Sequence, residues 1–246
     1  MTGIQPSKEA IAASRQRVVD ALRALVGDMR VAKESDEEKI ARGEGFDPNV
    51  YFTALDRLSL EPGYRLDYTY SANEVPCIYA RRMGPARSST WFETFSSPDE
   101  ITPAEGMLAF DHGNYGYTRH IHVTDDEDGF FQFVVLLEMG GQFHLYWHAL
   151  YHDETIVCTL EGLRAVLREP DDLGNRLPMS LADRARHIDL APVTTMGPDS
   201  VLVQVAEFSK WGGLSRRSYK IQRRFPHRIL DMSTEELVPF DCGILW

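Results

Sequence analysis

Six of the eight histidines lie between residues 107 and 158, and histidine can both transfer protons near neutral pH and ligate divalent metals. They are His112, His120, His122, His144, His148 and His152. His120 and His122 have the spacing most suited to shared chemistry, because residues i and i+2 of a strand project from one face about 7 Å apart. We interpret this pair as a candidate divalent-metal site or a catalytic acid–base pair, with a structural or pocket-lining role as the alternative.

A metal held by this pair would need a third ligand from a neighbouring segment. His144 and His148 do not form a second pair, since four residues of extended strand separate them by roughly 13 Å. Either of them reaches His120 and His122 only if the strand register turns it to the same face, and a slip of one residue reverses that face. The sequence leaves this register open.

Asp111 and His112 lie in a glycine-containing loop where both side chains can turn inward. We therefore keep His112 as a candidate for catalytic proton transfer and, with Asp111 and Asp125, as a candidate third metal ligand. Complete signatures of known chemistries are absent, since the chain has no H-E-x-x-H, G-x-S-x-G or phosphate-binding glycine motif. The three cysteines are odd in number and widely scattered, which indicates neither a disulfide framework nor a C-x-x-C site.

The elements that would position these histidines are predicted to be strands. Residues 118–124 alternate polar and apolar side chains, which is typical of a half-buried strand. Residues 130–139 form a nearly continuous apolar run, which favours a central strand covered on both faces. Residues 142–151 resume as a third strand, and the segments 125–129 and 140–141 have turn composition. We predict a three-stranded antiparallel meander.

Aromatic residues could provide the walls of a small-molecule pocket on this sheet. Residues 64–70 alternate strictly, with three tyrosines and a leucine on one face of the predicted strand. A sheet that curves would bring such a face around a cavity together with the third strand of the meander. The alternative is that these aromatic side chains are ordinary core. The candidate lining residues are Tyr68, Tyr70, His144, Trp147 and His148.

Residues 208–230 contain seven basic residues and no acidic one, against a formal net charge of −11 for the whole chain. The first interpretation is a cationic strand face, formed by Arg216, Lys220 and Arg224, that binds phosphate or carboxylate. The candidate ligand-binding residues of the segment are Arg217, Lys220 and Arg224. The second is an edge strand whose charges prevent unwanted pairing. The third is a stripe that pairs with acidic surface of its own chain or of a sister subunit.

The remaining pattern predicts an α+β fold. N-terminal helices are expected at residues 7–29, 35–42 and 47–58, and further helices follow Thr159 and Ser180. They would pack on a large, mainly antiparallel sheet that curves or approaches a barrel. We divide the chain into an N-terminal helical segment, residues 1–60, and a sheet domain, residues 61–246, within a single compact unit.

Composition limits the function classes. With 43% hydrophobic residues and no apolar run of about 18, the chain is expected to be soluble and cytoplasmic, without a membrane span. Its negative charge argues against nucleic-acid binding. The leading hypothesis is a protein that binds a small molecule or another protein through the sheet. The alternative is an enzyme that uses the histidine pair, with or without a divalent metal; a homo-oligomer is left open.

Overall fold

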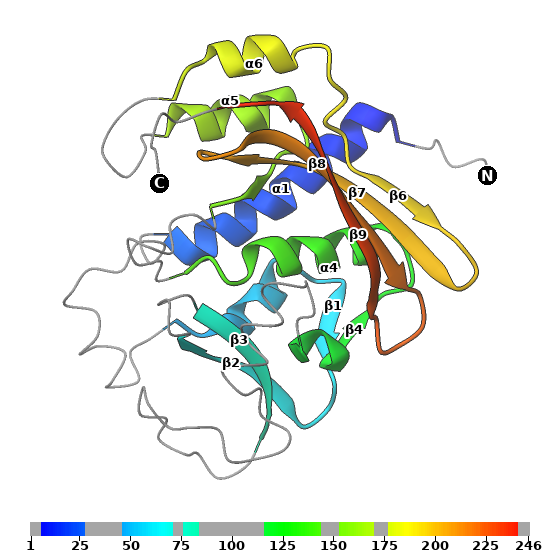
Figure 1. The fold of residues 1–246 in the computed structure, drawn as a ribbon. Helices are drawn as coiled ribbons and strands as arrows, with labels where there is room; N and C mark the ends of the chain where they lie inside the picture. The colour runs from blue at the N-terminus through cyan, green and yellow to red at the C-terminus, as the bar shows by residue number, and fades with distance from the viewer. Residues whose placement is uncertain are drawn as a thin grey trace, which may run out of the picture.

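The computed structural model describes residues 6–27, 46–70, 76–83, 116–143, 153–169 and 177–240, with the backbone alone at positions 69, 70, 76 and 77. The chain is a mixed α+β protein with antiparallel sheets, as predicted (Figure 1). Its helices are α1 (Lys8–Val26), α4 (Glu127–Met139), α5 (Leu160–Arg168) and α6 (Ser180–Ala185), with the 3₁₀ helices η2 (Pro48–Thr53) and η3 (Gly116–His120).

In the described part of the chain, the strands are divided among three antiparallel sheets rather than forming one. They are β1 (Leu58–Leu60), β2 (Tyr64–Tyr70), β3 (Pro76–Arg82), β4 (Ile121–Val123), β5 (Thr155–Ile156), β6 (Val193–Met196), β7 (Ser200–Ser209), β8 (Gly213–Gln222) and β9 (Ile229–Val238). β1 pairs with β4 and β2 with β3. The third sheet has the order β5-β7-β8-β9, with β6 on the same side of β7 as β5, and β9 forms its opposite edge.

The centre of the molecule is helix α4, and the predicted meander is wrong at this point. The apolar run that we assigned to a central strand is helical from Glu127 to Met139. Gly129 to Leu137 are all buried, and α4 contacts α1, β1, β4, β5, β6 and β7. A helix that is apolar on all sides belongs in a core, so burial on both faces was predicted correctly while the backbone conformation was not.

The start of α4 is specified locally. Asp126 is the N-cap and its carboxylate accepts a hydrogen bond from Gly129 N at 2.7 Å. Glu127 and Asp128 in the first turn add negative charge where the helix dipole favours it. The segment that we predicted to be a turn is therefore a capping sequence, and the strand predicted before it is reduced to η3 followed by the short β4.

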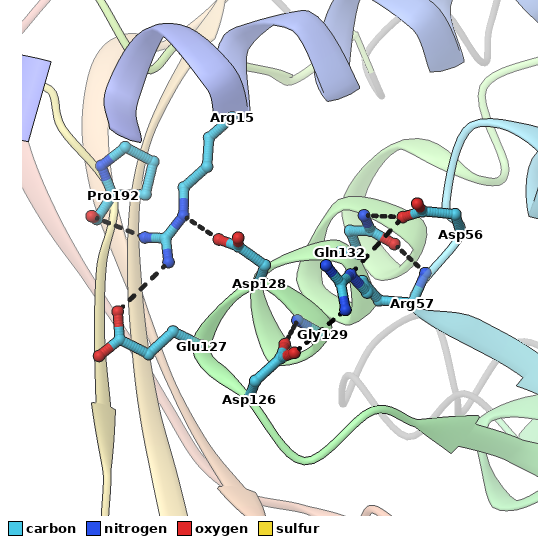
Figure 2. A network of polar contacts seen from close by, with 9 residues as sticks. All are labelled: Arg15, Asp56, Arg57, Asp126, Glu127, Asp128, Gly129, Gln132 and Pro192. Carbon is cyan, nitrogen blue, oxygen red and sulfur yellow. Dashed lines mark hydrogen bonds and ion pairs between the residues drawn. The ribbon is translucent and has the colours of Figure 1, made fainter. Parts of the chain in front are cut away.

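Polar contacts join the first turns of α4 to α1 and β1 (Figure 2). The buried Arg15 of α1 donates to Asp128 Oδ1 and to the carbonyl oxygen of Pro192, both at 3.0 Å. On the other side, the Gln132 amide accepts from Arg57 N at 2.8 Å and donates to Asp56 Oδ1 at 2.9 Å. These bonds fix the position of the helix along its own axis, which apolar packing alone does not do.

Other local predictions are confirmed. Ser7 caps α1 and Thr159 caps α5 through their side-chain oxygens. The strand at residues 64–70, the hairpin of β6 and β7, and the strand preferred for residues 214–225 are all present, the last as β8. The helix predicted at 35–42 lies outside the described residues, and β9 was not predicted. Within the described ranges, no helix combines the length and apolar character that crossing a bilayer demands.

Candidate ligand-binding pocket

A pocket of about 380 Å³ is lined by residues at the C-terminal ends of α1, α4 and α5. Figure 1 shows these helix ends on its left. Its apolar wall comes from Leu22 and Val26 of α1 and from Met139, the last residue of α4. Gly27 and Glu169, the C-caps of α1 and α5, complete the rim. The volume lies in the range of small-molecule sites, about 300–1,000 Å³.

The polar lining of this pocket is mainly acidic. Asp20 accepts a hydrogen bond from Gln16 at 3.0 Å and remains exposed. The cation in the wall, Arg23, is neutralised by Glu169, whose two carboxylate oxygens lie 2.7 and 2.8 Å from its guanidinium. Among the described residues that line the pocket, one carboxylate is therefore in excess. The ends of three helices add partial negative charge, because the last carbonyl groups of a helix have no intrahelical partner.

Gln142 joins the pocket to a buried ionic cluster beside it. Its amide lines the pocket and donates to the backbone carbonyls of Glu138 at 3.3 Å and Glu154 at 2.6 Å. The side chain of Glu138 turns inward from the last turn of α4 and accepts a hydrogen bond from Arg217 of β8 at 2.7 Å. Arg217 also lies 2.7 Å from Glu207 of β7. These contacts hold the C-terminal end of α4 against strands β7 and β8.

The cluster of Glu138, Glu207 and Arg217 holds two carboxyl groups against one guanidinium, and the carboxyl group of Glu154 lies close enough to act on all three. Both glutamate side chains are 4% exposed. Burial, followed by the nearby Glu207, raises the pKa of Glu138 to about 8, and burial also raises the pKa of Glu207. Each carboxyl has one buried oxygen without a hydrogen-bond partner. A single proton held between the two groups would satisfy both oxygens, so we assign one positive charge, one negative charge and one neutral acid to this cluster.

The predicted histidine pair is divided between different partners. His120 Nδ1 lies 2.8 Å from Glu61 Oε2, and the imidazole stacks on Tyr64 with ring centroids 4.0 Å apart. The ring of His122 stacks on Phe225 at 4.2 Å. Within the part of the chain that the structure describes, no group of three or more histidine, cysteine or acidic residues could hold a metal ion.

Three of the seven basic residues in the segment 208–230 pair with acidic residues that the structure describes in their own chain. Besides the buried Arg217, Arg216 lies 3.5 Å from Glu235 on the neighbouring strand, and Arg223 lies 2.7 Å from Asp125. These arginines pair within the chain, as the third interpretation of the segment expects. Lys220 and Arg224 are exposed, and neither lines the pocket.

The remaining predicted site residues do not meet at the pocket. Tyr68 packs edge-on against Phe143, with ring centroids 4.7 Å apart, and belongs to the border of the main core. Tyr70 lies at the end of β2, and its side chain is outside the described atoms. The candidates His112, His144, Trp147 and His148 lie outside the described residues.

Sequence reasoning missed the pocket because its walls are helix ends that are far apart in the chain. The local signals at these ends, Gly27 after α1 and Gly140-Gly141 after α4, are ordinary helix stops. No family model, curated protein or solved structure matches the chain. The candidate site therefore rests on the geometry of this molecule alone.

Proposed function

We propose that this chain is a binding protein that takes a small organic cation in the pocket between the C-terminal ends of α1, α4 and α5. The observation that carries the proposal is the convergence of three helix C-termini on one partly apolar hollow of about 380 Å³. This function keeps the small-molecule binding predicted from the sequence and moves it from the sheet to the helix ends.

The apolar wall supports an organic ligand rather than a hydrated ion. Leu22, Val26 and Met139 line the hollow with hydrocarbon and thioether groups, of which only the outermost atoms are exposed. Burying an apolar group contributes about 25 cal/mol per Å². Methionine suits such a wall, because its flexible and polarisable side chain adapts to irregular shapes. A bare metal ion would gain nothing from these side chains.

The charge of the pocket supports a positive ligand. Glu169 already compensates Arg23, which leaves the Asp20 carboxylate and the three helix ends facing the hollow. Each helix C-terminus carries the equivalent of roughly half a negative charge, and a cation there is typically stabilised by about 0.3–1 kcal/mol. An alkyl- or arylammonium compound presents an apolar body and a cationic head, and so matches both features.

The test compares benzylammonium with two probes of similar size, benzyl alcohol and benzoate, by isothermal titration calorimetry. We expect benzylammonium to bind with a dissociation constant on the order of 1 mM, because a ligand with so few atoms can gain only a small binding free energy. Benzyl alcohol and benzoate should bind at least severalfold more weakly. Replacement of the exposed lining residue Ala24 by tryptophan should fill the hollow and abolish binding. Ala21→Trp, on an exposed position of α1 outside the pocket, is the matched control.

Equal binding of all three probes, or binding that survives Ala24→Trp, would contradict the proposal. Asp20→Asn separates charge from shape, because it keeps the size of the side chain and removes the uncompensated carboxylate. It should weaken benzylammonium severalfold and leave benzyl alcohol unchanged.

A second candidate function is supported by the contact between His120 and Glu61. An imidazole held by a carboxylate is oriented to accept a proton, which is the role of a general base. Metal analysis of protein purified without a histidine tag, combined with a hydrolase substrate panel, tests this alternative. A stoichiometric metal lost in His120→Ala and His122→Ala, or an activity lost in both His120→Ala and Glu61→Gln, would support an enzyme over a binding protein.

Cytoplasmic location, a protein partner and the absence of nucleic-acid binding stay predictions from the sequence. The net charge of −11 continues to support the last of these, because nucleic-acid backbones attract an excess of lysine and arginine.

A further inference from the structure

The turn between β8 and β9, residues 223–228, packs a buried histidine against the first turns of α4. His227 is 5% exposed, and its ring lies edge-on to Phe130 and Phe133 of α4, with centroids 5.5 and 6.1 Å apart. The ring of Phe225, from the same turn, lies at 6.1 Å. Aromatic side chains therefore surround the imidazole on several sides, and such surroundings disfavour its charged form.

One hydrogen bond of this imidazole fixes its neutral tautomer. Nδ1 of His227 donates to the backbone carbonyl oxygen of Gln222 at 3.2 Å. A neutral imidazole carries a single N–H, so a further proton has to be taken up at Nε2. Proton uptake thus creates a positive charge among the aromatic side chains.

The charged groups that face His227 do not reverse this effect. Burial lowers the pKa of His227 below its ordinary value of 6.5, and the nearby His122 of β4 lowers it further. The backbone of Gln222 and Arg223, together with Asp125 before α4, acts in the opposite direction without outweighing burial. The closed turn therefore holds the proton less tightly than an open turn would. An open form gains population as pH falls below 6.5.

The ion pair that also attaches this turn is insensitive to the same change in pH. Arg223 donates to both carboxylate oxygens of Asp125, at 2.7 and 2.9 Å, and this lowers the pKa of Asp125 below its ordinary value of 3.8. The pair is therefore still charged at pH 5. Because both side chains are partly exposed, it contributes little to holding the turn closed. The next acidic residue, Asp126, lies near Arg57 instead.

The ladder beneath the turn contains an irregularity at which the turn can bend. On successive residues of β8, the pairing passes from Asp231 directly to Ile229, so Leu230 is an extra residue. A β-bulge of this kind disrupts the ladder locally and bends the strand that carries it. Residues 223–228 can therefore move without separating the rest of β8 and β9.

We infer that the β8–β9 turn is a pH-sensitive latch: when His227 takes up a proton, residues 223–228 detach from α4 and uncover Phe130 and Phe133. Both phenylalanine side chains are fully buried in the closed form. The opening would thus expose an apolar surface at the start of α4 while the sheet stays folded, which is a local opening rather than global unfolding.

Two backbone amides report the state of the latch. The N–H of Gln222 donates to the carbonyl oxygen of Arg228 at 2.8 Å, and the N–H of Arg223 donates to that of Asp199 at 3.0 Å. Amide hydrogen exchange of the full chain is followed by NMR at pH 5 and pH 7 and corrected for the intrinsic exchange rates. We expect both amides to lose protection severalfold at pH 5.

Substitutions assign this loss to one histidine. His227→Gln cannot titrate and should keep the same protection at both pH values, because its amide can still donate to the Gln222 carbonyl group. His187→Gln, at an exposed position after α6, is the matched control and should behave as the wild type. Asp125→Asn should lower protection at both pH values and retain the loss on acidification.

Equal protection of the wild type at pH 5 and pH 7 would overturn the inference, as would a loss that persists in His227→Gln or disappears in Asp125→Asn. If His227→Gln leaves the turn open at both pH values, an NMR titration of His227 in the wild type decides. A midpoint that coincides with the loss of amide protection supports the latch, and a separate midpoint overturns it.

Discussion

Replacement of Glu138 by glutamine tests the proton that we assign to the buried cluster. Glutamine has the shape of a protonated glutamate, and its amide can donate to Glu207 as the carboxyl proton does. If Glu138 is neutral in the folded protein, Glu138→Gln keeps the contacts of the neutral acid. It then removes only the free-energy cost of ionising a buried carboxyl group at higher pH. If both glutamates were ionised around Arg217, the substitution would instead break a buried ion pair and cost about 3–5 kcal/mol.

The magnitude follows from the pKa of Glu138. Its ordinary value is 4.5, and burial raises it to about 8 in the folded chain. The folded state therefore holds the proton more tightly than the unfolded state, and the stability of the wild type falls as pH rises from about 4.5 to 8. At about 1.4 kcal/mol per pH unit, the loss is about 3 kcal/mol at pH 7 and about 5 kcal/mol above pH 8. Glu138→Gln does not titrate and should escape this loss.

Urea denaturation at pH 5, 7 and 9 measures the difference. We expect Glu138→Gln to match the wild type within about 1 kcal/mol at pH 5 and to exceed it by several kcal/mol at pH 9. Glu161→Gln, at an exposed position on α5, is the control and should show no such dependence on pH. A variant that is less stable than the wild type at pH 9, or a difference that does not change with pH, would refute the shared proton.

Three more substitutions probe the attachment of α4. Arg15→Leu should lower the free energy of unfolding by about 1–3 kcal/mol because it leaves the buried carbonyl group of Pro192 unpaired, whereas the exposed Arg17→Leu should have little effect; urea titration compares them. Asp126→Ala removes the N-cap and should cost about 1 kcal/mol, measured in the same way, and a neutral result would show that the cap is dispensable. Gly129→Ala would press a methyl group against the backbone carbonyl of Thr124 and should lower the melting temperature by calorimetry, at a cost of about 1–3 kcal/mol.

The sequence predicted those helices and strands that are started or ended by contacts between residues close together in the chain. The side-chain oxygens of Ser7 and Thr159 each accept a hydrogen bond from the backbone three residues on, so the start of α1 and α5 could be predicted from composition alone. The hairpin of β6 and β7 likewise follows from alternation around a turn. In these cases sequence neighbours are also spatial neighbours.

Helix α4 shows where such reasoning fails. A continuous apolar run is compatible with a buried strand and with a buried helix, because neither has a polar face to reveal its period. Two signals were present at its start, the cap Asp126 and the acidic first turn. The apolar run from residue 130 to 139 is also longer than the usual strand of about five or six residues. If these signals had been given more weight than the β-branched and aromatic content of the run, the sequence would have predicted a helix.

The candidate site depends on contacts that no local pattern encodes. Arg217 and Glu138 are 79 positions apart, and Arg23 and Glu169 are 146 apart. The histidines were predicted to form a site because they lie close together in the sequence. The pocket, in contrast, is formed by the ends of three helices that are far apart in the chain. Only the tertiary packing of α1, α4 and α5 brings its charges together.

A crystal structure of the chain grown with benzylammonium tests the central claim most directly. We expect the ammonium group to lie within hydrogen-bonding distance of the carboxylates of Asp20 and Glu169, with the ring against Leu22 and Met139. A ligand bound at another place, or an ammonium group turned away from both carboxylates, would contradict it.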